Sequence, residues 1–326
     1  MTKRALITGV AGQDGTYLAE LLLDRGYDVY GVVGPVTGEL LPPIAERAGE
    51  RLHLLQGDLT DMDSLLEAVT AAQPDEVYNL AAMSFVGDSW KQALTTTDIN
   101  AVGVLRLLEA LRNECPSARF LQAASGEVFG RAKGGAAQNE STPLHPRSPY
   151  GASKAYAYFI TLNYRESYGM HTSNAVLFNH ESPRRGINFV TRKITDGAAR
   201  IKLGLADELP MGNLDSRRDW GFAGDYVEAM WLMLQQDAPG DFVIATGDGH
   251  SVREFCDHAF ARLDLDYREY VKVDERFLRP ADVDVLLGDA TKARTVLQWE
   301  PRVSFRELVE MMVDADMAKL TDQVGA

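Results

Sequence analysis

Short apolar runs alternate with helical patterns over the first half of the chain, and this alternation limits the possible folds most strongly. The runs are too short to be buried helices, and the stretches between them have a helical period. A β–α–β–α order predicts an α/β fold, a doubly wound parallel sheet with helices on both faces. The expected strands are Ala5–Thr8, Asp28–Val33, Leu52–Gln56, Glu76–Leu80, Phe120–Ala124 and Ser173–Phe178. The expected helices are Tyr17–Asp24, Met62–Ala71, Ala101–Asn113 and one that begins near Lys154.

The pattern changes after about Glu181, where charged loops with glycine and proline appear. We therefore expect one domain in residues 1–180 and a smaller, mostly helical lobe in residues 181–326 that covers the carboxyl edge of the sheet. Later segments are expected to return to the first domain. The helices expected in the second part are Arg192–Leu203, Asp225–Leu234, Val252–Arg262 and Ser304–Lys319.

The charge balance and the cysteine count exclude several classes of function. The formal net charge is -14, whereas nucleic acids and anionic membranes are bound by basic faces. The only cysteines, Cys115 and Cys256, cannot form a disulfide framework, which suits a reducing compartment. The first residues are too strand-like for a signal peptide, and no apolar run approaches transmembrane length. We expect a cytoplasmic protein with no nucleic-acid or membrane partner.

A glycine-rich segment, Gly9–Gly15, lies between the first strand and the first helix. Glycines in this position allow a tight turn and close backbone approach to a pyrophosphate at the helix N-terminus. The segment therefore predicts that residues 1–180 form a Rossmann dinucleotide-binding domain. The predicted cofactor contacts are Gly9, Gly12, Gln13, Asp14 and Gly15.

Two later segments are consistent with a dinucleotide site. Asp58 and Leu59 follow the third strand, where a carboxylate reaches an adenine amino group, although Asp58 is equally suited to cap a helix. The segment Leu80, Ala81, Ala82 follows the fourth strand with small residues, which suit either backbone beneath a cofactor or plain packing.

Tyr150 and Lys154 are four residues apart, which places them on one face of a helix. We expect the lysine ammonium to lower the pKa of the phenol, and an oxidised nicotinamide to add to this effect. The tyrosine then takes a hydroxyl proton while hydride leaves the carbon. Ser125 and Glu127 follow the fifth strand, where side chains at the sheet edge face a substrate. The alternative is that Ser125 is only a turn or cap residue and Glu127 only a solvated acid in a loop.

Several segments closely resemble the GDP-mannose 4,6-dehydratase family, which are extended short-chain dehydrogenase/reductase proteins of nucleotide-sugar metabolism. The resemblance covers nearly the whole chain. It is carried by Pro146–Lys154, Leu177–Gly186, Phe189–Lys193, Gly212–Asp215, Arg218–Gly221, Tyr226–Leu234, Phe242–Gly247, His250–Phe255 and Arg279–Pro280.

The resemblance implies a lyase that makes a 4-keto-6-deoxy sugar by transient C4 oxidation, loss of water across C5 and C6, and hydride return to C6. It implies that Tyr150 is the base with Lys154 as its partner, that Ser125 holds the C4 oxygen, and that Glu127 removes the C5 proton. The implied cofactor contacts also include Leu177, Asn179, His180 and Arg185. The implied substrate contacts in the smaller lobe and nearby loops are Ser84, Asn179, Val190, Lys193, Arg218, Arg279 and Asp282.

The segment after the second strand, Val33-Gly34-Pro35, decides neither between NADP and NAD as cofactor nor between a dimer and a tetramer. The resemblance implies NADP, but the segment holds neither an acid for a free 2′-hydroxyl nor an arginine for a 2′-phosphate, so NAD is the alternative. The family's loop there also joins subunits into a tetramer. We expect a homodimer, with a tetramer as the alternative.

Other departures from the family keep further readings open. Met83, Phe85, Asn100 and Gly126 stand where the family usually has glutamine, histidine, aspartate and serine. A related substrate such as a GDP-heptose, or a 5,6-dehydration, is one alternative, and a sugar-nucleotide epimerase or reductase is another. Glu127 argues against simple reduction, which needs no C5 base. A nucleotide-sensing binding protein would not need Tyr150 and Lys154, and no metal site is expected.

Overall fold

The computed structural model describes residues 2–34, 41–130, 135–274, 276 and 285–325. Within them, a seven-stranded sheet has the order β10-β6-β5-β4-β1-β2-β3, and every neighbouring pair in it is parallel. The predicted doubly wound parallel sheet is confirmed. The strands are β1 (Arg4–Thr8), β2 (Asp28–Val33), β3 (Leu52–Gln56), β4 (Glu76–Asn79), β5 (Arg119–Ser125), β6 (Thr172–Leu177) and β10 (Phe242–Ile244).

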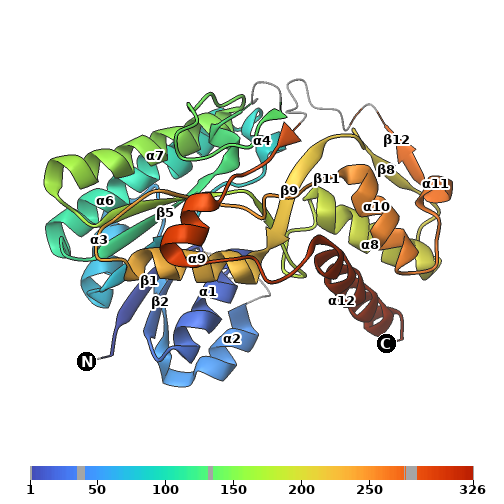
Figure 1. Ribbon diagram of the computed structural model, residues 1–326. Coiled ribbons are helices and arrows are strands. Elements are labelled where there is room, and N and C mark those ends of the chain that lie inside the picture. The colour runs from blue at the N-terminus through green and yellow to red at the C-terminus, as the bar shows by residue number, and fades with distance from the viewer. Residues whose placement is uncertain (1, 35–40, 131–134, 275, 277–284, 326) are drawn as a thin grey trace.

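Helices cover both faces of this sheet (Figure 1). Alternate residues of each strand face opposite sides, so Ile7 joins the core beneath α1 and α9 while Leu6 joins the core beneath α3 and α6. One layer contains α1 (Gln13–Asp24), α2 (Leu41–Ala48) and α9 (Ala223–Gln235), and the other contains α3 (Met62–Ala72), α6 (Gly103–Glu114) and α7 (Pro149–Tyr168).

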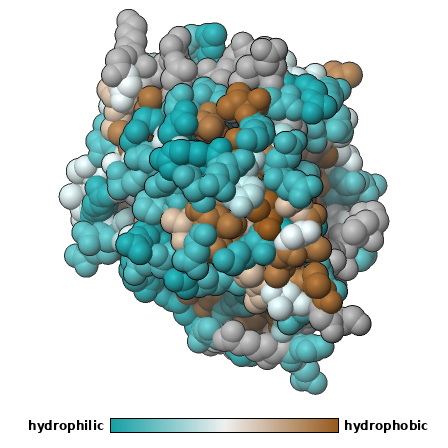
Figure 2. Space-filling view, turned by 90° about the vertical axis from the view of Figure 1, so that its right-hand side faces the viewer, coloured by the Kyte–Doolittle hydropathy of each residue, from teal (hydrophilic) through white to brown (hydrophobic). Residues whose placement is uncertain are grey.

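The second lobe lies beside the carboxyl end of the sheet and has its own core (Figure 1). Its helices are α8 (Val190–Lys202), α10 (Val252–Ala261), α11 (Tyr267–Tyr270) and α12 (Phe305–Gly325). Its strands are β7 (Asn179–Glu181), β8 (Leu209–Met211), β9 (Arg217–Phe222), β11 (Gly249–Ser251), β12 (Val271–Val273) and β13 (Val285–Leu286). The face formed by this lobe is mainly hydrophilic, with smaller hydrophobic groups near its centre (Figure 2).

Two later segments lie against the first part of the chain. Strand β10 pairs with β6 at the edge of the main sheet, and α9 packs on α1. The chain thus crosses between the two parts more than once. The boundary between residues 180 and 181 stays a prediction.

Most predicted elements are confirmed to within a few residues, and the largest differences are the start of α7 and the end of α12, which was expected at Lys319 and lies at Gly325. The helix expected near Lys154 begins at Pro149, because the hydroxyl of Ser148 accepts a hydrogen bond from Gly151 N and proline suits the first helical position. The predicted strand Glu76–Leu80 ends one residue earlier, at Asn79. The residues before α6, Asp98–Val102, form a π-helical turn where we expected α-helix from Ala101.

Candidate active site

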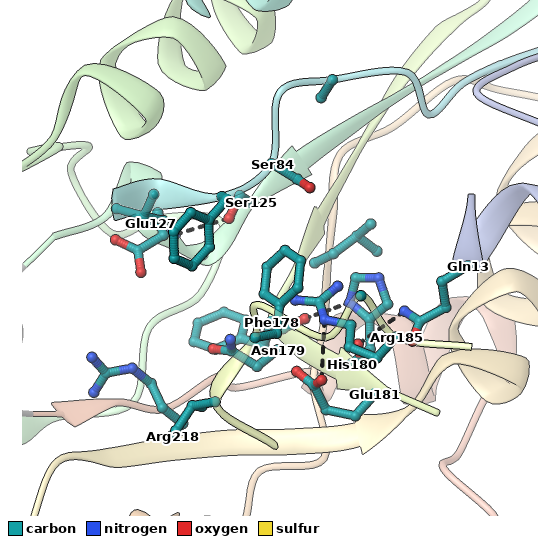
Figure 3. Close-up of a pocket in the computed structure, with 18 of the residues that line it drawn as sticks. Gln13, Ser84, Ser125, Glu127, Phe178, Asn179, His180, Glu181, Arg185 and Arg218 are labelled. Carbon is teal, nitrogen blue, oxygen red and sulfur yellow. Dashed lines mark hydrogen bonds and ion pairs between the residues drawn. The ribbon is translucent and has the colours of Figure 1, made fainter. Parts of the chain in front are cut away.

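A cavity of about 690 Å³ lies where the carboxyl ends of the central strands meet the second lobe. Strands β1, β4, β5 and β6 end at its wall, and the second lobe closes it from the other side. Such a position between strand ends is where open α/β sheets bind their ligands. In Figure 3, Glu127 and Ser125 lie at one end of the view and Gln13 at the opposite end.

The glycine-rich turn is built so tightly that side chains would not fit. Gly9 has a φ of +72°, and a Cβ there would lie 2.8 Å from Ala81 N. A Cβ on Gly15 would lie 2.2 Å from the carbonyl oxygen of Gly9. Gly9 is therefore required where the turn meets the segment after β4, and Gly15 where α1 packs on the turn itself. The N-terminal turn of α1 opens onto the cavity.

Gln13 and Asp14, the first residues of α1, tie this turn to β7. Gln13 Nε2 donates to the carbonyl of His180, and Ser182 donates to Gln13 Oε1 at 2.8 Å. The Asp14 carboxylate lies 2.8 Å from Nε2 of His180. Burial acts to raise the pKa of Asp14, but the neighbouring His180 outweighs it and lowers that pKa to about 2.

Tyr150 and Lys154 both line the cavity from the first turns of α7, as their spacing predicts. Lys154 Nζ donates to the carbonyl of Ala123 at 2.8 Å. Burial lowers the pKa of Lys154 to about 8.

In the protein alone the pKa of the Tyr150 phenol is raised rather than lowered, and the separate effect of the Lys154 ammonium stays a prediction. Burial raises the pKa of Tyr150 to about 12; a hydrogen bond with Ser125 lowers it, and the charge of Glu127 raises it further. Lys154 Nζ lies 5.9 Å from the centre of the tyrosine ring, and burial of the phenol dominates.

Ser125 and Glu127 come from the turn that ends β5. The Glu127 N–H donates to Ser125 Oγ at 3.3 Å, so the serine caps the short 3₁₀ turn Gly126–Val128 and also reaches Tyr150. A Cβ on Gly151 would lie 2.9 Å from the Glu127 carbonyl, which shows how closely α7 approaches this turn. The geometry thus brings a phenol, a hydroxyl and a carboxylate to one wall of the cavity.

The second lobe contributes cationic side chains. Lys193 lines the cavity from α8, and burial lowers its pKa while the carboxylate of Asp274 opposes this. Arg218 on β9 is 9% exposed. The neighbouring Asp219 accepts hydrogen bonds from the backbone N–H groups of Thr246, Gly247 and Gly288, and so holds β9 in place.

Arg185 is held by an acid and an aromatic ring that the sequence reasoning missed. Its Nε lies 3.1 Å from Glu181 Oε2, and its guanidinium carbon lies 3.7 Å from the centre of the Phe189 ring. Phe189 in turn meets Phe85 edge-to-face at 5.7 Å, across the two parts of the chain. Glu181 and Arg185 are four apart but not in a helix, so only the fold could reveal the pair.

The segment that carries Arg185 is anchored by Arg192 of α8, which is in turn paired with Asp316 of α12. Arg192 donates to the carbonyls of Pro183 and Arg185 at 2.7 and 2.8 Å, and it pairs with Asp316 at 2.6 Å. The neighbouring Arg184 makes two hydrogen bonds with Glu20 on α1.

The cavity brings together most of the predicted site residues. It is lined by Gly9, Gly12, Gln13, Asp14, Gly15, Leu80, Ala81, Ala82, Ser84, Ser125, Glu127, Tyr150, Lys154, Leu177, Asn179, His180, Arg185, Val190, Lys193 and Arg218. Asp58 and Leu59 are not part of this lining: Asp58 accepts hydrogen bonds from Thr60 in its own turn, and Leu59 is buried in the core. Arg279 and Asp282 lie outside the described residues.

Additional lining residues were not predicted as contacts. They include Phe85, Val86, Phe178, Glu181, Arg184, Phe189, Met211, Asn213, Ser216, Trp220, Val252 and Leu286. Most of these residues lie in apolar or short segments that carry no sequence signal for binding, and only the fold brings them to the cavity. Among the described residues, no cluster of histidine, cysteine and acidic side chains is arranged to hold a metal ion, and no helix is long and apolar enough to cross a membrane.

Comparison with solved structures supports the same architecture. UDP-glucose 4-epimerase from Thermotoga maritima, solved with UDP-glucose, superposes with a TM-score of 0.86 at 25% identity, covering 97% of this chain and 99% of that one. UDP-glucose 4-epimerase from Thermus thermophilus, solved with NAD, gives a TM-score of 0.84 at 28% identity, covering 96% and 98%.

Comparison of sequences identifies the family. The family model described as GDP-mannose 4,6 dehydratase matches residues 6–312. GDP-mannose 4,6 dehydratase 2 of Arabidopsis thaliana is 51% identical, covering 97% of this chain and 87% of the relative. GDP-mannose 4,6 dehydratase of Homo sapiens is 47% identical, covering 96% and 91%. Together with a cavity that holds Ser125, Glu127, Tyr150 and Lys154 on one wall, these matches show that the chain belongs to the GDP-mannose 4,6-dehydratase family.

Proposed function

We propose that this protein dehydrates GDP-mannose to its 4-keto-6-deoxy form. The observation that carries the proposal is the position of Glu127, which lines the same cavity as Tyr150 and lies close enough for its charge to raise the pKa of that phenol. A carboxylate beside the C4 base has a role in elimination and none in simple reduction or epimerisation at C4.

The cavity fits a nicotinamide dinucleotide. Gly9 and Gly15 leave no room for side chains, a Cβ on Gly12 would lie 3.3 Å from the Gly9 carbonyl oxygen, and the N-terminus of α1 suits a pyrophosphate. Tyr150, Lys154 and the segment Leu80–Ala82 would hold the nicotinamide half. When bound, the cofactor supplies the redox partner for oxidation at C4 and reduction at C6, and it is regenerated in each turnover.

The protein's own groups carry out the proton transfers. Tyr150 takes the proton of the C4 hydroxyl, and Ser125, which hydrogen-bonds the phenol, holds the C4 oxygen. The buried Lys154 ammonium and the charge of a bound oxidised cofactor offset the burial that raises the pKa of Tyr150. Once C4 is a ketone the C5 hydrogen is acidic; Glu127 removes it and returns a proton to the C6 hydroxyl, which leaves as water. When C6 is reduced, C5 takes up a proton from solvent, and Tyr150 releases to solvent the proton that it took from the C4 hydroxyl, so the protons balance.

The nucleotide end of the substrate is assigned to the second lobe. Lys193 and Arg218 supply positive charge for the diphosphate, and Asn179 and Val190 line the same cavity. A guanidinium presents a planar fork that bonds two phosphate oxygens at once. Arg279 and Asp282 remain proposed substrate contacts on the strength of the family resemblance alone.

The test is mass spectrometry after incubation with a panel of nucleotide sugars. We expect GDP-mannose to give a product lighter by one water, with no consumption of added cofactor. The related alternatives make distinct products: an epimerase leaves the mass unchanged, and a reductase consumes reduced cofactor. If GDP-mannose is returned unchanged while UDP- or dTDP-sugars lose water, the substrate assignment is wrong.

We further propose that the chain forms a homodimer. Large apolar side chains are exposed together on neighbouring helices: Leu94 of α5 (Ala93–Thr97) is 90% exposed, and Trp90, Tyr156 and Phe159 are about half exposed. Grouped apolar side chains of this size mark an interface, and a symmetric dimer buries the same patch on both copies. Light scattering should give twice the mass of the chain, and Leu94→Glu should give a single chain that keeps its fold.

A further inference from the structure

A row of buried polar side chains crosses three neighbouring strands at the carboxyl end of the main sheet. Thr8 of β1 is in register with Asn79 of β4, and Asn79 is in register with Gln122 of β5. The three residues are at most 1% exposed. They face the same side of the sheet as α7, next to the apolar core beneath α3 and α6.

The hydrogen bonds in this row run in one direction. Thr8 Oγ1 donates to Asn79 Oδ1 at 2.6 Å, and Asn79 Nδ2 donates to Gln122 Oε1 at 2.7 Å. Gln122 Nε2 then donates to the carbonyl of Ala123 at 2.8 Å. Since a carbonyl oxygen only accepts, each amide in the row has one orientation that satisfies all of its neighbours.

Both ends of the row reach the cavity. At one end, the N–H of Ala81 donates to Thr8 Oγ1 at 3.2 Å. At the other, the carbonyl of Ala123 accepts a second hydrogen bond, from Lys154 Nζ at 2.8 Å. Ala81, Ala123 and Lys154 all line the cavity.

The end of β4 explains why side chains are needed here. Strand β4 stops at Asn79, opposite Gln122, whereas β5 continues to Ser125. Beyond Gln122 no β4 residue is in register with β5, so the sheet ladder on that side no longer holds the backbone of β5. The Gln122 amide and the Lys154 ammonium meet at the first carbonyl past this point.

We propose that Asn79 and Gln122 are positioning residues for Lys154, and that they fix the Ala123 carbonyl which anchors the lysine ammonium. This inference rests on the proposed dehydration, in which Lys154 acts on Tyr150. The rival explanation is that the row only satisfies buried polar groups for the stability of the fold.

Two variants of the holoenzyme separate these explanations. Gln122→Met leaves the Asn79 amide unpaired, and we expect it to lower both Tm and kcat. The double variant Asn79→Leu/Gln122→Met removes both members of the pair, and replacing both partners by apolar groups is close to neutral for stability. Thr8 Oγ1 still accepts from Ala81 N but loses Asn79 Oδ1 as its own acceptor. We expect the double variant to recover part of the lost Tm but none of the lost kcat, with kcat down roughly ten- to a hundred-fold.

Two further readouts test the position of Lys154. The KM for GDP-mannose and the cofactor occupancy should stay unchanged, because neither Asn79 nor Gln122 lines the cavity. The alkaline limb of the kcat profile should move to lower pH, since an ammonium that loses a fixed acceptor loses its proton more easily.

Asn174 provides a matched control. It lies in register with Gln122 on β6 and is fully buried, but its amide bonds to Asp241 and the Tyr158 carbonyl rather than to the row. Asn174→Leu should lower Tm and leave kcat and its pH profile unchanged. If the double variant regains both Tm and kcat, the row contributes only to stability and does not position Lys154.

The unaltered holoenzyme is assayed in parallel, so that failure of the proposed function is recognised separately. If it does not dehydrate GDP-mannose, the proposed function is wrong. The positioning role of Asn79 and Gln122 is then tested by a measurement that does not depend on catalysis. In that case the Lys154 side-chain nitrogen is titrated by NMR in both proteins. A lower pKa in the double variant supports the positioning role, and an unchanged pKa overturns it.

Discussion

Nε2 of His180 lies 2.8 Å from Oδ2 of Asp14, while Nδ1 of the same ring lies 2.7 Å from the carbonyl oxygen of Phe178. Both neighbours are hydrogen-bond acceptors, so both ring nitrogens donate a hydrogen bond when the imidazole is protonated. Burial opposes this charge, but the Asp14 carboxylate outweighs burial and raises the pKa of His180. The pair joins β7 to the first turn of α1, beside the glycine cradle.

The Asp14–His180 pair should make stability depend on pH. The pKa of Asp14 is lowered to about 2, so its contribution is complete above its ordinary value of 3.8 and is lost as the pH falls through about 2. The pKa of His180 is raised, so its contribution is complete below the ordinary 6.5 and is lost as the pH rises through the raised value. Asp14→Asn should therefore lower Tm most between about pH 4 and pH 6.5. A Tm difference that is constant from pH 4 to pH 9 would contradict the charged pair.

Glu127→Gln should stop elimination while the fold and cofactor binding persist. Glutamine has nearly the same shape but cannot take a proton, and loss of a general acid/base lowers the rate by about 10²–10⁴-fold. Turnover of GDP-mannose is followed by product mass. Glu269→Gln, on the exposed surface of α11, is the control and should turn over normally. Normal dehydration by Glu127→Gln would remove this residue from the mechanism.

Lys154→Met should inactivate the enzyme and stabilise the cofactor-free chain. Burial lowers the pKa of Lys154 from 10.5 to about 8, so at pH 7 the fold carries the cost of a buried ammonium, about 3 kcal/mol. The unfolded chain binds more protons between these two pKa values, so this cost diminishes as the pH rises from about 8 to 10.5. Urea unfolding at pH 7 and at pH 10 measures the gain. A variant less stable than the parent at pH 7 would show that the contact with Ala123 outweighs burial.

Two aspartates on α12 form a matched pair for testing the anchor of the Arg185 segment. Asp316 is 4% exposed and pairs with Arg192, whereas Asp314 is 54% exposed and pairs with Arg262. Asp316→Asn should cost about 3–5 kcal/mol of unfolding free energy, because it leaves a buried guanidinium without its charge partner. Asp314→Asn should cost less than about 1 kcal/mol.

The same pair of variants tests whether the anchor serves cofactor binding. Arg192 holds the carbonyls of Pro183 and Arg185, so loosening it should weaken dinucleotide binding. Titration of both variants with cofactor should show a higher Kd for Asp316→Asn alone. Equal Kd values would confine Arg192 and Asp316 to a role in stability.

Cofactor selectivity should favour NADP, but less sharply than in other members of the family. The described end of β2, Val33 and Gly34, provides neither an acid that repels a 2′-phosphate nor an arginine that binds it. Arg185 is already paired with Glu181. Each missing charge-assisted contact, about 1.5–3 kcal/mol, reduces selectivity roughly ten- to a hundred-fold. The measurement is titration of cofactor-free protein with NADP and with NAD. Strict selectivity for either dinucleotide would contradict the prediction.

The alternation of apolar and polar residues along the sequence was enough to predict the sheet domain and the residues that follow its strands. The period of the apolar residues identified β1 to β6 nearly to the residue, and parallel strands place their carboxyl ends at one edge. For that reason Ser125, Glu127, Tyr150 and Lys154 could be assigned to one site from sequence position and family resemblance. Ser148 and Pro149 are a capping signal in the sequence that marks the start of α7.

Only the tertiary structure determines the burial of the site residues and their contacts with residues far away in the sequence. The pKa of Tyr150 is raised mainly by its burial. Arg185 is set by Glu181, Phe189 and the remote Arg192–Asp316 pair, and Lys154 by Asn79 and Gln122 acting through the Ala123 carbonyl. Sequence periodicity reports which face of an element is apolar. Desolvation and hydrogen bonds between distant residues exist only once the chain has folded and brought those residues within a few ångströms of one another.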